Sequence, residues 1–318
     1  MLRSEDHFLE IVDSLFPNTH PQMAVGRGDD CAVIECPGRL CVSSDLFLED
    51  VHFRTRYFSP EDIGYKALAS NLSDLAANGA DPLGFNLCLI WPEYLDQEYC
   101  RRMLGSMAEL AGEFDLALTG GDLSFGTSLG LSISLWGEAP AKSMLRSQAK
   151  PGDILFVVGE IGMARAGLVL LEEDQPEKEH YPGCVQQHLR PFPLVREGRL
   201  MADLEGIKGA MDVSDGLARD LPRFLSSGTG VKLAPGVELH PEILGFCRQR
   251  QLDPLDFVLR GGEDYALLGA CEPQAWERIA ARISLTRYLG RVTDSPGIFL
   301  EGRKLSLKGF DHFEREEL

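Results

Sequence analysis

The sequence lacks the segments that would place it in a membrane or in an oxidising compartment. No apolar run approaches the roughly 18 residues that a membrane-spanning helix needs. The first residues, MLRSEDHFLEIVDSLF, carry acids in an amphipathic pattern, which is not typical of a secretory signal. The eight cysteines form no CxxC pair, so they read as reduced packing residues rather than metal ligands. We therefore expect a cytoplasmic protein with no membrane partner.

Positive charge is also scarce. Lysine and arginine number 31 against 49 aspartates and glutamates, which gives a formal charge of −18. Such a surface repels the phosphate backbone of nucleic acids instead of attracting it. We therefore expect no nucleic-acid partner.

Several familiar catalytic and phosphate-binding motifs are absent. The sequence contains no G-x-x-x-x-G-K-[ST], no H-E-x-x-H and no G-x-S-x-G. The stretch GRGDDC begins like G-x-G-x-x-G but has Cys31 at the sixth position. If the chain binds a nucleotide, it needs another way of holding phosphates.

The chain is long enough for two domains or one large one. Helices are predicted over residues 4–16, 60–78 and 96–112, and alternation predicts a half-buried strand in GLSISLWGE. An antiparallel or mixed sheet is expected in this half. Near residues 141–151 the pattern changes, and the apolar strand ILFVVG leads into the helix MARAGLVLLEE. The charged stretch EEDQPEKEHYPG is expected to be an exposed loop.

Six separated stretches repeat one local design, in which an acid stands beside glycine or serine. They are GRGDDC, VSSDLF, NLSDLAANGADP, LTGGDLSFG, MDVSDG and RGGEDYAL. Magnesium prefers oxygen ligands and is commonly bound through one or two carboxylates plus phosphate oxygens of a substrate. Nearby glycines let backbone N–H groups approach those phosphates. The pattern favours a nucleotide bound through several magnesium ions by an acidic protein.

Each stretch also has a purely structural interpretation. Asp and Ser before a glycine, as in MDVSDG, are ordinary turn and helix-cap residues, and a cap is the more common role for one such segment. Asn71, Asp74 and Asn78 form a polar stripe on the predicted helix 60–78, and such stripes are usually solvated. Only the whole set of stretches favours the magnesium interpretation.

The ordered set of motifs resembles the thiamine-monophosphate kinase family, of the superfamily that includes aminoimidazole ribonucleotide synthetase. The resemblance runs nearly end to end through GDDCAV, SSDLFLEDVHF, YKALASNLSDLAANGADP, GGD, LRSQAKPGD, HLRP, DVSDGLARDL, GGEDYAL and KGFDHF. It implies ATP-dependent phosphorylation of thiamine monophosphate to thiamine diphosphate. It also implies roles for particular residues. The magnesium ligands would be Asp30, Ser43, Ser44, Asp45, Asp74, Asp122, Asp212 and Asp215. The residues in contact with ATP would be Gly121, Asp122, Arg146 and Ser214. The residues in contact with thiamine monophosphate would be His52, Glu263 and Phe310.

The resemblance further implies an α/β fold of two domains. Residues 1–145 would form a mixed-sheet domain that binds metal and ATP and makes a homodimer through its sheet. Residues 146–318 would form a larger α/β domain, with the active site in the groove between the two. The family usually has glycine where this chain has Asp50, so the turn before His52 is expected to differ.

The implied chemistry needs no general base. A phosphate monoester has its second pKa near 6, so it is already an ionised nucleophile at neutral pH. Asp30, Asp45, Asp74, Asp122 and Asp212 would act through bound metal, and direct in-line transfer is expected.

Two alternatives remain. One is another ATP-dependent reaction of the superfamily, such as that of the purine-biosynthesis synthetase. The other is a sensor that holds Mg-ATP without turnover. Four of the implied site residues also have a purely structural interpretation. Arg146 could form a salt bridge, and His52 could be a hydrogen-bonded histidine at a strand end. Glu263 could cap a turn, and Phe310 could be a core aromatic residue.

Overall fold

A computed structural model describes residues 5–28, 31–36, 38–174 and 176–305. The chain divides into two compact units, which we describe separately. Unit 1 comprises Met1–Leu75 and Ala80–Ala139, and unit 2 comprises Ala76–Gly79 and Pro140–Leu318. Across the described ranges, no helix combines the length and apolarity needed to cross a bilayer.

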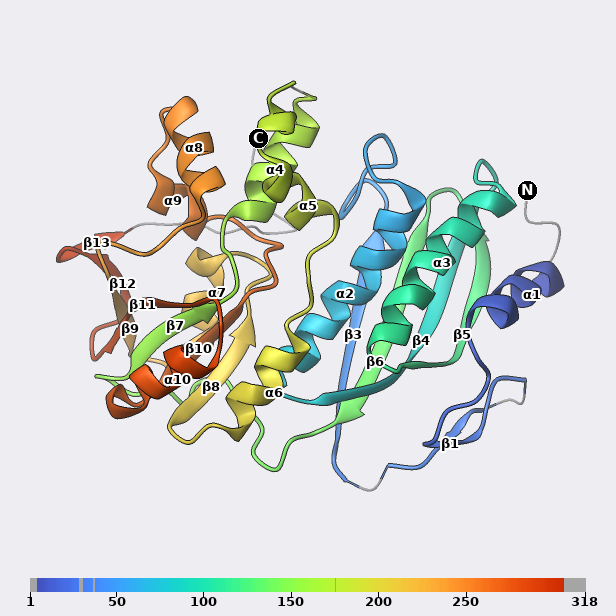
Figure 1. The fold of residues 1–318 in the computed structure, drawn as a ribbon, viewed down its shortest axis with the longest axis horizontal. Coiled ribbons are helices and arrows are strands. Elements are labelled where there is room, and N and C mark those ends of the chain that lie inside the picture. The colour runs from blue at the N-terminus through green and yellow to red at the C-terminus, as the bar shows by residue number, and fades with distance from the viewer. Residues whose placement is uncertain (1–4, 29–30, 37, 175, 306–318) are drawn as a thin grey trace. The chain divides into compact units, whose positions relative to one another are not determined.

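Unit 1 is built on a four-stranded mixed sheet (Figure 1). Its strands are ordered β3 (Leu40–Leu48), β6 (Gly130–Glu138), β4 (Asp81–Pro92) and β5 (Ala117–Gly126). The β4–β5 pair is parallel and the other two pairs are antiparallel. The expected mixed sheet and the strand at 130–138 are confirmed. Strand β5 was not predicted, because its glycines and polar residues hide the strand pattern.

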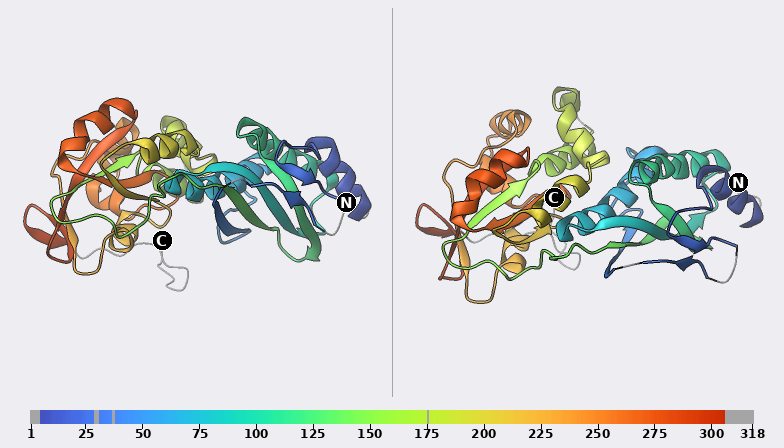
Figure 2. Two further views of the ribbon diagram at one scale, coloured as in Figure 1. Left: turned by 90° about the horizontal axis from the view of Figure 1, so that it is seen from below. Right: turned by 60° about the horizontal axis from the view of Figure 1, so that its bottom comes forward.

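Helices cover one face of this sheet (Figures 1 and 2). They are α1 (Glu5–Leu15), α2 (Pro60–Asn78) and α3 (Gln97–Glu113), and a small ribbon of β1 (Met23–Val25) and β2 (Val33–Ile34) completes the unit. The predicted helix 60–78 is confirmed and ends at Gly79, whose φ is +76°. A Cβ atom on Gly64 would lie 1.9 Å from the Met103 carbonyl oxygen, so α2 and α3 pack closely.

The other face of the sheet carries exposed apolar side chains. Leu40, Val42 and Leu46 alternate along β3 and are between 50% and 68% exposed. Ile90 on β4 is 45% exposed. The helix-covered face is buried by comparison, as Leu87 and Leu89 on the same strand are at most 5% exposed.

Unit 2 contains a seven-stranded sheet in the order β13-β12-β9-β11-β7-β10-β8. The strands are β7 (Ile154–Val158), β8 (Ile207–Asp212), β9 (Gly230–Leu233), β10 (Leu267–Cys271), β11 (Thr286–Thr293), β12 (Gly297–Leu300) and β13 (Arg303–Leu305). Only the β9–β12 pair is parallel. The helices are α4 (Met163–Glu172), α5 (Pro182–Leu189), α6 (Val195–Asp203), α7 (Leu217–Phe224), α8 (Pro241–Gln249), α9 (Pro254–Leu259) and α10 (Trp276–Arg282), with 3₁₀ turns at Pro176–His180 and Pro273–Ala275.

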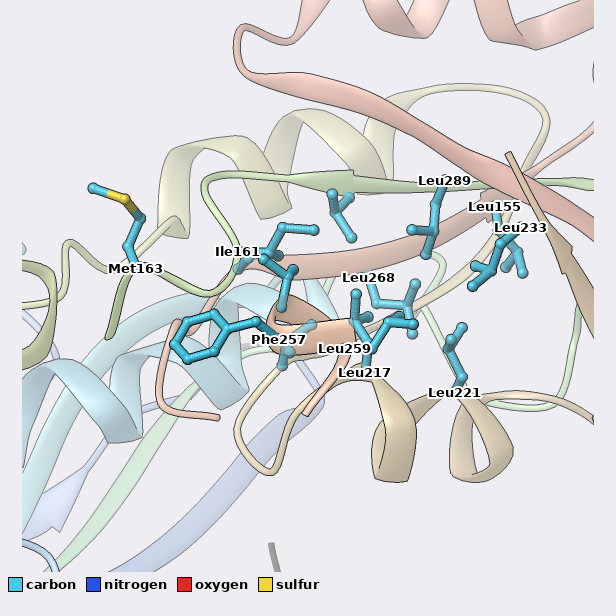
Figure 3. Close-up of a cluster of buried hydrophobic side chains, with 14 of the residues drawn as sticks. Leu155, Ile161, Met163, Leu217, Leu221, Leu233, Phe257, Leu259, Leu268 and Leu289 are labelled. Carbon is cyan, nitrogen blue, oxygen red and sulfur yellow. The ribbon is translucent and has the colours of Figure 1, made fainter. Parts of the chain in front are cut away.

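The core of unit 2 joins the central strands to α7 (Figure 3). Leu155 of β7 and Leu268 of β10 are fully buried together with Leu217 and Leu221 of α7. All five residues of β7 are buried, which explains its continuous apolar sequence. Packing in this core therefore holds α7 against the central strands.

The expected exposed loop at residues 172–183 is only partly correct. It contains the 3₁₀ turn Pro176–His180, and Tyr181 within it is buried, at 9% exposed. The Tyr181 hydroxyl donates to Gln249 Oε1 at 2.7 Å, and its ring meets Phe246 edge-on. The charged neighbours hid this anchor in the sequence.

Candidate active site

Three of the expected magnesium ligands meet on the helix-covered face of unit 1. Alternation along β3 puts Ser43 and Asp45 on the same face, and α2 brings Asp74 to it. The Ser43 hydroxyl donates to Asp74 Oδ2. Burial, followed in size by the nearby negative charge of Asp74, raises the pKa of Asp45 to about 6. Part of the Asp45 side chain stays open to solvent. Two carboxylates held this close favour a cation between them.

This donor set fits magnesium. It offers carboxylate and hydroxyl oxygens, which are the ligands that magnesium prefers, and leaves further positions for phosphate oxygens. Over the described part of the chain, no three His, Cys, Asp or Glu side chains form a ligand group by themselves. Asp30 and Phe310, both expected at the site, lie outside the described residues.

Ser44 points away from this cluster. Its hydroxyl lies 2.9 Å from the Ser134 hydroxyl and donates to the Ile133 carbonyl oxygen at 3.2 Å. Because successive side chains of a strand alternate, Ser43 and Ser44 face opposite sides of the sheet. The Ser44 hydroxyl therefore does not lie beside Asp74.

Gly121 and Asp122 also lie apart from the carboxylate pair. Asp122 is in register with Cys88 on β4, on the face of the sheet opposite Leu87. Both line a hollow of about 810 Å³, together with Trp136 and with Phe8 of α1. A Cβ on Gly121 would lie 1.8 Å from the Leu87 carbonyl oxygen, and its φ is +155°. Glycine is therefore required for β5 to pair with β4 at Asp122. Within one unit, the structure does not bring Asp122 to Asp45 and Asp74.

The turn before His52 keeps the backbone conformation that a glycine would adopt. Asp50 has a φ of 62°, and its N–H donates to the Phe53 carbonyl oxygen at 2.9 Å. Aspartate tolerates this left-handed region better than most residues. The Leu48 N–H donates to Nδ1 of His52 at 3.0 Å, so this nitrogen is unprotonated and Nε2 carries the proton. The substitution of Asp50 for glycine therefore leaves a closed turn in place.

The expected site residues of unit 2 come together where two loops pair. The Glu263 N–H donates to the Ser214 carbonyl oxygen at 2.8 Å, and the Tyr265 N–H donates to the Val213 carbonyl oxygen at 3.0 Å. Asp212 ends β8 directly before this loop and is 4% exposed. Nδ1 of the buried His188 lies 3.4 Å from Glu263 Oε2.

Neither Ser214 nor Asp215 acts as a side-chain cap of α7. The N-cap residue is Gly216, with a φ of 94° and no side-chain cap. The capping interpretation of MDVSDG is therefore wrong. Asp215 instead accepts a hydrogen bond from Arg223 at 2.5 Å.

Arg146 lies on a segment that is tied to the end of α7. The N–H of the next residue, Ser147, donates to the Phe224 carbonyl oxygen at 2.8 Å. Arg146 is exposed, and its positive charge partly offsets the rise that burial causes in the pKa of Asp220 in α7. A cationic side chain is thus available near this helix.

Asp264, which lies in the stretch RGGEDYAL but was given no role at the site, has a clear structural role. It is 2% exposed and accepts hydrogen bonds from the N–H groups of Gly162 at 2.6 Å and Ala164 at 2.9 Å. Burial raises its pKa to about 7, against the effect of these two bonds. A sequence signal existed, because α4 begins after Gly162 without any Ser, Thr, Asp or Asn to cap it.

Asp264→Asn is expected to lower the free energy of unfolding by about 1 to 3 kcal/mol, because the amide group turns an acceptor oxygen into a donor facing a buried N–H. Urea denaturation measures the change. Asp256→Asn, at an exposed pair with Arg260, is the control and is expected to change stability by less than about 1 kcal/mol. Equal stability of the two variants would contradict the role of Asp264.

Family models match both units of the chain. The family model described as AIR synthase related protein, N-terminal domain, matches residues 28–139, and the C-terminal domain model matches residues 150–303. The thiamine-monophosphate kinase of Bacillus subtilis is 35% identical over 96% of this chain and 99% of its own length. That of Aquifex aeolicus is 34% identical over 90% and 92%.

Solved structures show the same fold. The one named AaThiL complexed with AMPPCP and TMP matches with a TM-score of 0.80 and 30% identity over 97% of both chains. The thiamine-monophosphate kinase of Stenotrophomonas maltophilia matches with a TM-score of 0.81 and 28% identity over 94% and 96% of the two chains. The chain therefore belongs to the AIR synthase related proteins and, among them, to the thiamine-monophosphate kinase family.

Proposed function

We propose that this chain transfers the γ-phosphoryl group of ATP to thiamine monophosphate, giving thiamine diphosphate and ADP. The observation that carries the proposal is the similarity, over 97% of both chains, to a solved structure named for its complex with AMPPCP and TMP. Curated relatives named thiamine-monophosphate kinase match at 33% to 35% identity over most of the chain. The alternative of a purine-biosynthesis reaction is not better supported.

Magnesium is the proposed metal. Ser43, Asp45 and Asp74 form the best-supported binding group, because their oxygens already lie together and two negative charges need compensation. When bound, the metal would neutralise negative charge on the nucleotide and on the transferred group. The remaining proposed ligands are Asp30, Ser44, Asp122, Asp212 and Asp215.

Nucleotide contacts are assigned to Gly121, Arg146 and Ser214, and Arg146 would supply a fixed positive charge to the phosphates. Substrate contacts are assigned to His52, Glu263 and Phe310. His52 would donate through Nε2, because its Nδ1 accepts the Leu48 N–H. In domain terms, residues 1–145 would bind metal and ATP and form the dimer, and residues 146–318 would supply the other contacts.

The proposed reaction is a direct in-line displacement. The acceptor phosphate is already ionised near neutral pH, so no side chain has to remove a proton. What opposes the reaction is repulsion between two anions. The protein's part is to position both phosphates and to hold the charges that reduce this repulsion.

An acceptor screen tests the function. The purified protein is incubated with ATP and magnesium, alone, with thiamine monophosphate, or with the purine-pathway acceptor, and ADP is measured. We expect ADP only with thiamine monophosphate, accompanied by thiamine diphosphate. ADP formation with the purine acceptor would favour the synthetase, and no ADP under any condition would favour a sensor.

A homodimer is proposed through the helix-free face of the unit 1 sheet. Leu40, Val42, Leu46 and Ile90 form an exposed apolar patch there, and such patches usually mark an interface. Val42→Asp is expected to convert a dimer to a monomer in light scattering, because a charge would be buried without a partner. Leu244→Asp on α8, where Leu244 is 41% exposed, is expected to stay dimeric. A monomeric wild type, or a dimeric Val42→Asp variant, would contradict the assignment.

A cytoplasmic location is proposed as well. All eight cysteines are free thiols, as expected in a reducing compartment. ATP, the proposed co-substrate, also suits this location.

A further inference from the structure

Asp215, which lies just before α7, is held by arginine side chains of that helix. Its Oδ2 atom lies 2.5 Å from the Arg223 guanidinium and 3.6 Å from Nε of Arg219. Residues four apart lie on one face of a helix, so both arginines reach back toward the start of α7. The carboxylate proposed as a magnesium ligand therefore already has a cation.

A second carboxylate shares this cation. Asp220 is fully buried, and its Oδ2 accepts the N–H of Asp215 at 3.1 Å. Its Oδ1 atom lies 3.6 Å from the Arg223 guanidinium and makes no hydrogen bond within the described part of the chain. Burial and the negative charge of Asp215 raise the pKa of Asp220 to about 6. Arg223 thus offsets the repulsion between two neighbouring acids.

The two carboxylates that contact Arg223 differ in solvent exposure. The Asp220 side chain has no exposed surface, whereas those of Asp215 and Arg223 are 23% and 42% exposed. An arginine stays protonated at any pH at which the protein is folded, so the ion pair with Asp215 cannot end by loss of the charge. It can end only if the Arg223 side chain moves away. Its exposure permits that movement without opening the core.

We propose that Arg223 is a built-in counter-ion for Asp215, and that Mg²⁺ binds at Asp215 by displacing the guanidinium. The inference rests on the proposed magnesium role of Asp215. Arg223 is then a positioning residue: it keeps the 213–216 loop in place before metal arrives, and it competes with metal for the same oxygen. Asp220 would keep accepting the hydrogen bond from the Asp215 N–H, and so would hold the loop when Arg223 moves away.

Arg223→Gln tests the exchange without catalysis. Binding of Mn²⁺ alone to the metal-free protein is measured by electron paramagnetic resonance, and thermal unfolding is followed as Mg²⁺ is added. Because a competing charge is removed, we expect binding at the site that depends on Asp215 to tighten about threefold or more. The metal-free variant is expected to unfold about 2 to 4 °C lower and to regain this loss with Mg²⁺. The double variant with Asp215→Asn identifies the site, since it should lose both effects.

Two further variants serve as controls. Arg223→Lys keeps a positive charge and is expected to behave like wild type or to fall between wild type and Arg223→Gln. Arg102→Gln removes an equally close arginine pair, to Glu61, where no metal is expected, and should leave Mn²⁺ binding unchanged. Unchanged or weaker Mn²⁺ binding in Arg223→Gln would overturn the inference, as would the absence of any Asp215-dependent binding. Neither result would change the outcome of the acceptor screen. The proposed kinase function and the proposed counter-ion role of Arg223 can therefore be contradicted independently.

Discussion

Asp74→Asn is expected to lower kcat/KM for thiamine diphosphate formation by about 100- to 1,000-fold, because the site loses a carboxylate that would hold the magnesium facing the reacting phosphates. Asp74 is the centre of its cluster: it accepts the Ser43 hydroxyl and acts electrostatically on Asp45. An amide can still hydrogen-bond but neutralises no cation. Steady-state kinetics at limiting and saturating magnesium measure the loss, which should be larger at limiting magnesium.

The fold should survive this change. Asp74 raises the pKa of Asp45 by repulsion, so its removal relieves strain between like charges, and the pKa of Asp45 should fall. Titration of the Asp45 carboxyl carbon by NMR, in metal-free protein, checks the direction. Glu61→Gln, on the first turn of the same helix, is the matched control and should keep wild-type activity. An Asp74→Asn variant with activity within about tenfold of wild type would contradict the metal assignment.

Gly121→Ala is expected to cost about 1 to 3 kcal/mol of stability or more, because its Cβ would be forced against backbone. The Leu87 carbonyl oxygen would lie 1.8 Å away, and a φ of +155° is itself strained for alanine. The strand can yield only by moving β5 away from β4, which displaces Asp122. Since a shift of about 1 Å can cost roughly 100-fold in rate, kcat/KM should fall by at least that much.

A second glycine provides the contrast. Gly105 lies inside α3, and a Cβ there meets nothing within 4 Å. Gly105→Ala is therefore expected to stabilise the protein by about 0.5 to 1 kcal/mol, with normal activity. Thermal and urea unfolding of both variants test the comparison. If Gly121→Ala were as stable as Gly105→Ala, the close approach of β4 and β5 would be wrong.

Much of unit 1 could be predicted because its signals are local. Ser59 and Asp62 cap the start of α2 in a reciprocal pair of hydrogen bonds, and Gly79 ends it. Alternation in GLSISLWGE identified β6. Strand β5 was missed because ALTGGDLSFG reads as a loop, although β4 imposes the extended conformation on it through pairing.

The sequence predicted which residues belong to the site, but not how their side chains lie relative to one another. Alternation along β3 could have separated Ser43 from Ser44, yet nothing local places Asp122 on the helix-free face. The roles of Arg223 and Asp264 depend on hydrogen bonds across 8 and about 100 residues of sequence. Contacts of this kind follow from the folded chain and leave only weak marks in composition or spacing.

The stereochemistry of transfer tests the central claim most directly. ATP made chiral at the γ-phosphorus with sulfur and oxygen isotopes is incubated with thiamine monophosphate, magnesium and the enzyme, and the configuration of the product is determined. Direct in-line transfer predicts labelled thiamine diphosphate with inverted configuration at phosphorus. Retained configuration would require a phosphorylated protein intermediate, and unlabelled thiamine monophosphate would mean that no transfer occurs. Either result would contradict the account.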